Sequence, residues 1–264
     1  MTTLALPTPR LVGADLLKLR RNRSLAAVTA VLVVGAVVLT VAIMELLHVA
    51  SPAKHGPAGG IRNLGHLASL ITLLGVAAAA IVGSRVGAGD KDAGVYRDLV
   101  VTGRSRMALY LSRIPAGAAF LFPFVAVAYA LAAVSAVVFA GSNPAPDTRL
   151  LVVTGLWTLL GVAFFYILSV TVAALLGSRS YAIGVILAFR LAITPIIASI
   201  SALGIVRELM PAIAIERLSP AALGEAARMG PRIGMSIAAV AAVLVVWTVV
   251  AIAVAGWRDA TRDA

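Results

Sequence analysis

The sequence contains no cysteine, and only 12% of its 264 residues are charged. Without cysteine the chain has neither disulfides nor thiolate metal sites. Hydrophobic residues make up 61% of the sequence, and the mean hydropathy is +1.02. A globular protein of this size needs more polar surface than that, so the composition indicates a protein whose solvent is largely lipid.

Catalytic motifs are missing as well. The sequence has no GxSxG, no HExxH and no nucleophile paired with a base, so we expect no catalytic residue. It also lacks the P-loop GxxxxGK[ST]. The glycine-rich "GSRVGAGDKDAG" has the wrong spacing, and Lys91 is not followed by Ser or Thr. If the protein transports a compound uphill, its source of energy must therefore lie outside this chain.

Histidine is scarce, and its three copies are His48, His55 and His66. Their spacings in a stretch rich in Pro and Gly match no compact ligand motif. We therefore interpret them as solvated loop residues and expect no metal site.

The net charge of +11 is unevenly distributed. Basic residues gather at the ends of apolar runs, where they act as topology signals. They form no basic groove with interleaved aromatic residues, so we expect no nucleic-acid partner.

Six apolar runs approach or exceed the ~20 residues that a helix needs to cross a bilayer. The first is longer than the ~7–15 apolar residues of a signal peptide, so we expect it to be retained. The fold class is therefore an all-α integral membrane protein, with residues 1–264 forming one transmembrane domain. The predicted spans are residues 25–47, 67–84, 114–140, 150–176, 181–206 and 233–256.

The distribution of Lys and Arg predicts the orientation of these spans. The two ends and the loops on their side contain 14 basic residues, and the opposite loops contain seven. This bias places both termini in the cytoplasm of a multi-pass protein of the cell (plasma) membrane. Residues 1–24, 85–113 and 257–264 are then cytoplasmic.

Residues 1–24 have the pattern of a helix lying in the membrane interface. Thr8 can cap it, Pro9 suits its first turn, and apolar residues recur at helical spacing from Leu11 to Leu19. Basic residues that follow can contact lipid headgroups, which makes membrane lipids a partner. The alternative is a short basic flank to the first span.

Residues 203–232, on the outer side, are partly apolar and contain Pro211, Pro220 and Pro231. Their apolar pieces are too short to span a membrane. We expect one or two short helices, re-entrant or interfacial, before the last span.

Arg190 lies about ten residues into the fifth span, hence ~15 Å deep. A charge there is costly and suggests function. No acid in another span lies at its depth. We therefore expect it to contact carbonyls, a hydroxyl such as that of Thr194, water, a lipid phosphate or an anionic substrate. Its role is either structural or that of lining a transport path.

Residues 89–106, "GDKDAGVYRDLVVTGRSR", hold seven of the 33 charged residues. Asp92 can cap a helix that begins near Ala93 and ends at Gly103. Such a helix places Val95, Tyr96, Leu99 and Val100 on one side and Arg97 and Asp98 on the other. A short helix of this kind can dock in the groove of a protein, although an ordinary charged loop remains the alternative.

Taken together, these features resemble the permease subunit of type-2 ABC transporters along essentially the whole chain. They are the interfacial helix that ends in "LLKLRRNRS", the charged loop between spans two and three, the six spans, and the outer segment. Within the loop, the family's pattern is matched by Asp92, Gly94-Val95, Leu99-Val100-Val101 and Ser105-Arg106. The family usually has Glu where Asp92 stands and Thr after the glycine.

The resemblance implies a half-transporter that pairs with itself or with a second permease, as a homodimer or heterodimer. Two copies of a separate ATPase would bind ATP and Mg, and this chain would hold no cofactor. The loop would form a coupling helix, whose contact residues are Asp92, Gly94, Val95, Tyr96, Arg97, Asp98 and Leu99. An exporter of a small amphipathic or lipid-like compound is expected.

Two other functions stay open: a docking or signalling subunit that transports nothing, and a secondary carrier. The lack of internal repeats and of intramembrane acids weighs against the carrier.

Overall fold

The computed structural model describes residues 8–94, 106–227 and 234–261, and every regular element within these ranges is helical. Six of its helices are long and apolar enough to cross a membrane. The predicted all-α, multi-pass fold is therefore confirmed. In chain order the six spanning stretches are Arg23–Ala50, Ile61–Asp90, Arg106–Val138, Thr148–Leu176, Arg179–Ser199 and Ile237–Arg258.

The spans are built from ten helical elements. Span one comprises α2 (Arg23–Ala30), the π-turn η1 (Val31–Gly35) and α3 (Ala36–Ala50), and span five comprises α8 (Arg179–Ala188), the π-turn η2 (Phe189–Ile193) and α9 (Thr194–Ser199). The other four are single helices. They are α4 (Ile61–Asp92), α6 (Arg106–Val138), α7 (Thr148–Leu176) and α11 (Ile237–Thr261).

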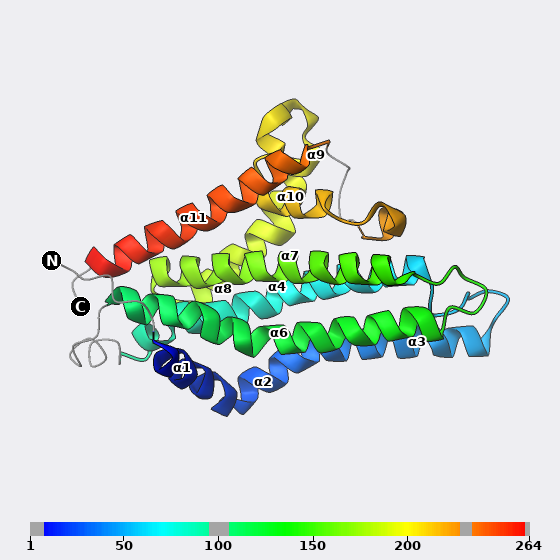
Figure 1. Ribbon diagram of the computed structural model, residues 1–264, viewed down its shortest axis with the longest axis horizontal. Coiled ribbons are helices and arrows are strands. Elements are labelled where there is room, and N and C mark those ends of the chain that lie inside the picture. Colours follow the sequence, from blue (N-terminus) through cyan, green and yellow to red (C-terminus); the bar gives the residue numbers. More distant parts are fainter. Residues whose placement is uncertain (1–7, 95–105, 228–233, 262–264) are drawn as a thin grey trace.

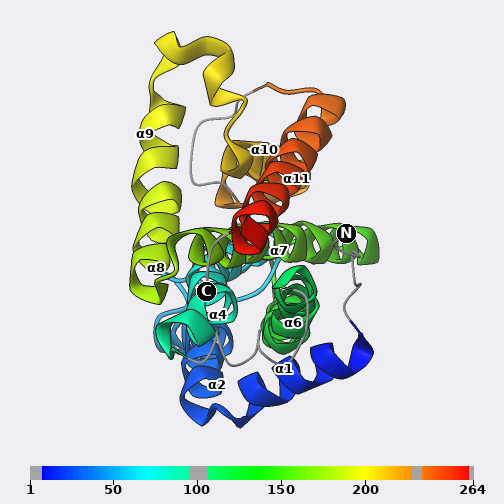
Figure 2. The same ribbon diagram turned by 90° about the vertical axis from the view of Figure 1, so that its left-hand side faces the viewer.

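Helices α4 and α7 form the centre of the molecule (Figures 1 and 2). Their contact depends on glycines of α4 that let the backbones approach. A Cβ at Gly83 would lie 2.6 Å from Ser169 Cβ, and one at Gly87 would lie 2.3 Å from the Val170 carbonyl oxygen. Close packing between small residues is the main source of helix association in lipid, where burial of apolar surface contributes little.

Helix α6 packs beside this pair although Pro115 and Pro123 lie within it. The Tyr166 hydroxyl of α7 donates a hydrogen bond to the Ile114 carbonyl at 2.8 Å. Gly117 makes that approach possible, since its Cβ would lie 2.2 Å from the Tyr166 oxygen. A side-chain hydrogen bond from the neighbouring span thus holds the part of α6 that contains Pro115.

The N-terminal helix α1 (Pro9–Arg21) is present as predicted. Thr8 stands at its N-cap position but makes no side-chain hydrogen bond there, so its predicted capping role is wrong. Leu19 is buried against the bundle, whereas Leu17 remains 51% exposed. Helix α1 lies with the end of α4, the start of α6 and the end of α11 at one end of the bundle, which we call the α1 side (Figure 2).

In the described residues between spans five and six, 200–227 and 234–236, the chain forms three short helices: η3 (Ser201–Arg207), α10 (Pro211–Arg217) and η4 (Ala221–Ala227). The predicted fifth span extended to residue 206, but α9 ends at Ser199 because Ile200 is extended and Gly204 adopts a φ of +48°. Helix α10 is largely buried and packs against α7 and α11. The indole nitrogen of Trp157 in α7 donates to the Ile215 carbonyl at 2.8 Å, which fixes α10 against the spans.

Candidate functional site

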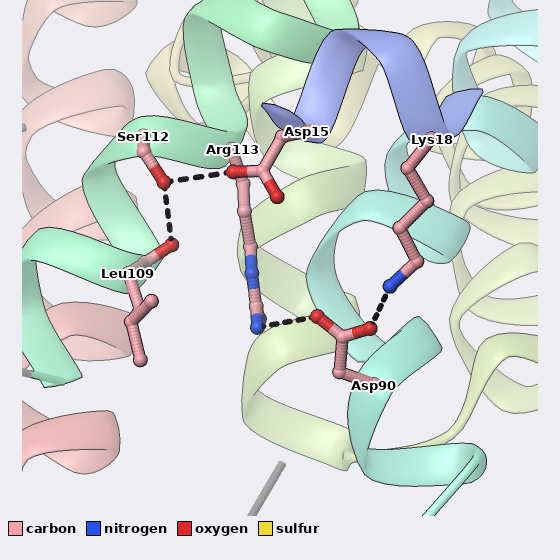
Figure 3. A network of polar contacts seen from close by, with 6 residues as sticks. All are labelled: Asp15, Lys18, Asp90, Leu109, Ser112 and Arg113. Carbon is pink, nitrogen blue, oxygen red and sulfur yellow. Dashed lines mark hydrogen bonds and ion pairs between the residues drawn. The ribbon is translucent and has the colours of Figure 1, made fainter. Parts of the chain in front are cut away.

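Charged residues of the described chain gather at two places. The first is the α1-side network, which we define as Asp15, Lys18, Asp90, Ser112 and Arg113 (Figure 3). It joins three helices that are far apart in the sequence. The second is the pair of Arg190 and Glu216, which joins span five to the short helix α10.

Asp90, in the last turn of α4, is the centre of the α1-side network. Its carboxylate is buried and accepts a hydrogen bond from Arg113 Nη2 of α6 at 2.8 Å. Lys18 of α1 donates to the other carboxylate oxygen. Arg113 is only 4% exposed, so this is a buried ion pair, and removing one partner of such a pair is strongly destabilising.

Asp15 provides a second connection between α1 and α6. The Ser112 hydroxyl donates to Asp15 Oδ2 at 2.8 Å. Burial raises the pKa of the Asp15 carboxyl above its usual value, while the hydrogen bond from Ser112 and the charge of Arg113 oppose that rise. Helix α1 is therefore attached to the bundle by polar contacts as well as by its apolar face.

This network borders the segment predicted to be a coupling helix. Asp90 lies near the end of α4, and Arg113 lies about two turns after the start of α6. The predicted loop 85–113 is therefore shorter than expected, because both flanking helices continue into it with their charged turns. Five of its predicted contact residues lie outside the described residues: Val95, Tyr96, Arg97, Asp98 and Leu99.

Asp92 has a different partner from the one predicted. Helix α4 continues through Asp92, so this residue ends a helix rather than capping one near Ala93. Its carboxylate accepts hydrogen bonds from Arg179 at the start of α8, at 2.6 Å from Nε and 3.2 Å from the backbone nitrogen. The side-chain hydrogen bond from Arg179 lowers the pKa of Asp92 below its usual range.

Gly94, the other predicted contact residue within the described chain, has a φ of +71°. No atom lies within 4 Å of where its Cβ would be, so the glycine serves the backbone conformation rather than the packing. A left-handed glycine just past a helix is a common C-terminal stop.

Arg190 has a carboxylate partner that the sequence analysis did not find. Its Nη2 lies 3.0 Å from Glu216 Oε1, and the arginine is only 6% exposed. The prediction concerned acids in other spans, and Glu216 lies outside the spans, in α10, which packs against α7 and α11. The sequence feature that could have indicated this partner is Glu216 itself, which is the single acid in the apolar run "PAIAIERL".

Thr194 bonds to the backbone rather than to Arg190, since its hydroxyl donates to the Phe189 carbonyl at 2.7 Å and so satisfies part of the π-turn. A cavity of about 210 Å³ nevertheless brings the two predicted pathway residues together. It is lined by Arg190, Leu191, Thr194, Pro195, Ala198, Ile213 and Glu216. The site thus combines an ion pair, a hydroxyl and apolar walls.

A model of the ABC-2 family of transporter proteins matches residues 11–195. The matched region runs from α1 to the start of α9, and it contains the α1-side network and Arg190. Comparison with curated proteins gives no match. Because the family model covers well over half of the 264 residues, and six helices can span a membrane, this chain belongs to the ABC-2 family of membrane transport proteins, as a permease subunit.

Proposed function

We propose that the chain is the permease of an ATP-driven exporter, and that residues 89–106 dock a separate ATPase. The observation that carries this proposal is the placement of the α1-side network. It ties the helix before the loop and the helix after it to each other and to α1. A push on the loop is then delivered to three helices at once.

The energetics of the network suit that role. Breaking a buried ion pair by removing one partner costs about 3–5 kcal/mol. Thermal motion therefore seldom separates Asp90 from Arg113, and α4 and α6 move together at this end. A flexible connection would absorb the displacement of the loop instead of transmitting it to the spans.

Membership of the family implies the remaining subunits of the transporter complex. Two copies of the ATPase bind ATP and Mg, and the permease pairs with itself or with a second permease in the cell membrane. Both termini and the loop face the cytoplasm, as the bias of basic residues predicts.

The transport path in this proposal passes the cavity beside Arg190 and Thr194. Arg190 needs an anionic partner, and Glu216 supplies one in this conformation. In the opposite conformation, α10 moves away with Glu216, and an anionic group of the cargo takes its place. A small amphipathic or lipid-like compound with an acidic group fits a cavity with apolar walls and one guanidinium.

Affinity purification of the full chain in a mild detergent tests the docking. We expect an ABC ATPase to co-purify with the wild type and to be lost from the variant that combines Tyr96→Ala with Arg97→Glu. Arg62→Glu, at the opposite end of α4, is the matched control and should retain the ATPase. If the wild type co-purifies without an ATPase, or if the loop variant retains it, the docking role is wrong.

A further inference from the structure

We propose that the α1 side carries a binding site for a phosphate group, supplied by the headgroup of an anionic phospholipid. The site is a cavity of about 210 Å³ enclosed by α1, α4, α6 and the start of α8. That volume is far more than the ~10–15 Å³ needed for one water, so it can hold an anion of several atoms. The inference goes beyond the transport role and does not depend on it.

The cavity exists because small residues line it beside long ones. Gly89, Ala93 and Ala116 have little or no side chain. Arg85 lies one turn before Gly89 on α4, and its Cγ is 3.6 Å from where a Gly89 Cβ would stand. Larger side chains at these three positions would reduce the volume of the cavity.

Positive charge is in excess around this cavity. Its lining contains four cations, Lys18, Arg85, Arg113 and Arg179, against two carboxylates, Asp15 and Asp90. Asp90 is shared by Lys18 and Arg113, and Arg179 is paired with Asp92 outside the lining. The arrangement therefore retains a net positive charge.

Arg85 is the cation best placed to bind a ligand. It is half-buried and lines the cavity, and within the described part of the chain no ion pair involves it. A guanidinium presents a planar fork of donors that matches a phosphate, and hydrogen bonds between charged groups are about twice as strong as neutral ones. Lys18, with a side chain 61% exposed, can supply a second cation.

Helix α1 favours a lipid as the source of the phosphate. Leu17 is 51% exposed beside Lys18 and so offers apolar contact to acyl chains next to a cation. Basic pockets between membrane helices bind the headgroups of anionic lipids by the same combination of charge and apolar surface. The headgroup would bridge α1 and α4 and so hold α1 against the bundle.

Thermal unfolding of the full-length protein in detergent tests the site. Micelles receive either phosphatidylglycerol or phosphatidylcholine, and separate samples receive inorganic phosphate or chloride at equal ionic strength. We expect phosphatidylglycerol to raise the unfolding midpoint more than phosphatidylcholine does, because a ligand that binds only the folded state stabilises it.

Arg85→Gln should weaken the apparent affinity for phosphatidylglycerol at least about tenfold, the effect of losing one hydrogen bond between charged groups. Arg62→Gln, the same change at the other end of α4, should leave it unchanged. Lys18→Gln should weaken binding less, and it provides a second variant if Arg85→Gln fails to fold.

The lipid samples and the inorganic-anion samples distinguish the two possible sources of the phosphate group. Stabilisation by inorganic phosphate without a response to phosphatidylglycerol would support the phosphate chemistry and assign the site to a soluble anion. The proposal is overturned if neither ligand exceeds its control. It is also overturned if Arg85→Gln and Lys18→Gln bind phosphatidylglycerol as tightly as Arg62→Gln.

Discussion

The two charged sites differ in how their ion pairs are supported. At the α1-side network a buried carboxylate receives two cations from two other helices, and a second acid reinforces the contact. At the Arg190 site the ion pair joins a span to the short helix α10, and it borders a cavity. In the proposed function the first arrangement transmits force, whereas the second borders a cavity in which a ligand can replace Glu216.

The largest expected effect comes from removing the central acid of the network. Asp90→Ala leaves Arg113 buried without its carboxylate and should cost about 3–5 kcal/mol of stability. Thermal unfolding in detergent, followed by size-exclusion chromatography, measures this cost.

A double-mutant cycle then tests whether the pair is coupled. Adding Arg113→Ala to Asp90→Ala should restore part of the lost stability, since the buried guanidinium that lost its Asp90 partner is then also removed. If the two losses simply add, Asp90 and Arg113 do not act as a pair, and the contrast between the two sites disappears.

Substitutions at the Arg190 site should reduce stability less, and transport more, than substitutions in the α1-side network. Glu216→Gln should cost about 1–3 kcal/mol, less than Asp90→Ala, because its side chain is 17% exposed and the cavity can hold water around Arg190. Arg190→Leu should reduce substrate-stimulated ATP hydrolysis by the reconstituted complex about tenfold or more. Unchanged hydrolysis in a folded Arg190→Leu protein would assign the pair a structural role only.

Asp15 should respond to pH in the opposite sense from an ordinary ion-paired acid. Because its folded pKa is raised, the stability that it contributes is present below the unfolded value of 3.8 and is lost as the pH rises through the folded value. Asp15→Asn, which mimics the protonated form, should therefore raise the unfolding midpoint at pH 7 relative to the wild type. If the difference in unfolding midpoint between Asp15→Asn and the wild type becomes smaller from pH 4 to pH 7, the pKa of Asp15 is not raised in the folded protein.

The smallest effect on stability is expected from Asp92→Asn, because the side chain of its partner Arg179 is 41% exposed. Exposed pairs contribute about 0–1 kcal/mol. The pKa of Asp92 is lowered in the folded protein. The stability that Asp92 contributes is therefore present above the unfolded pKa of 3.8 and is lost only as the pH falls through the folded pKa. The midpoint of Asp92→Asn should thus lie slightly below that of the wild type at pH 7 and coincide with it in strong acid.

The sequence predicted the architecture well because that architecture is set by local properties. Span length, mean hydropathy and the amphipathic pattern of α1 belong to continuous stretches of chain, and all of them reappear in the helices observed. The predicted ends of the spans were less accurate. Helix α4 continues past its predicted end through a charged turn, and the helix of span five ends early, at Ser199, because the backbone at Ile200 is extended.

The sequence by itself determined that six apolar helices are long enough to cross a membrane and that an amphipathic helix precedes them. It also predicted a charged loop of the ABC-2 type between spans two and three, most of which lies outside the described residues. Only the tertiary structure decided which charges meet. Lys18 and Asp90 are 72 residues apart, Asp92 and Arg179 are 87 apart, and Arg190 and Glu216 are 26 apart. No local pattern encodes such pairs, because they depend on how close the glycines of α4 bring the helices and on where α10 folds back.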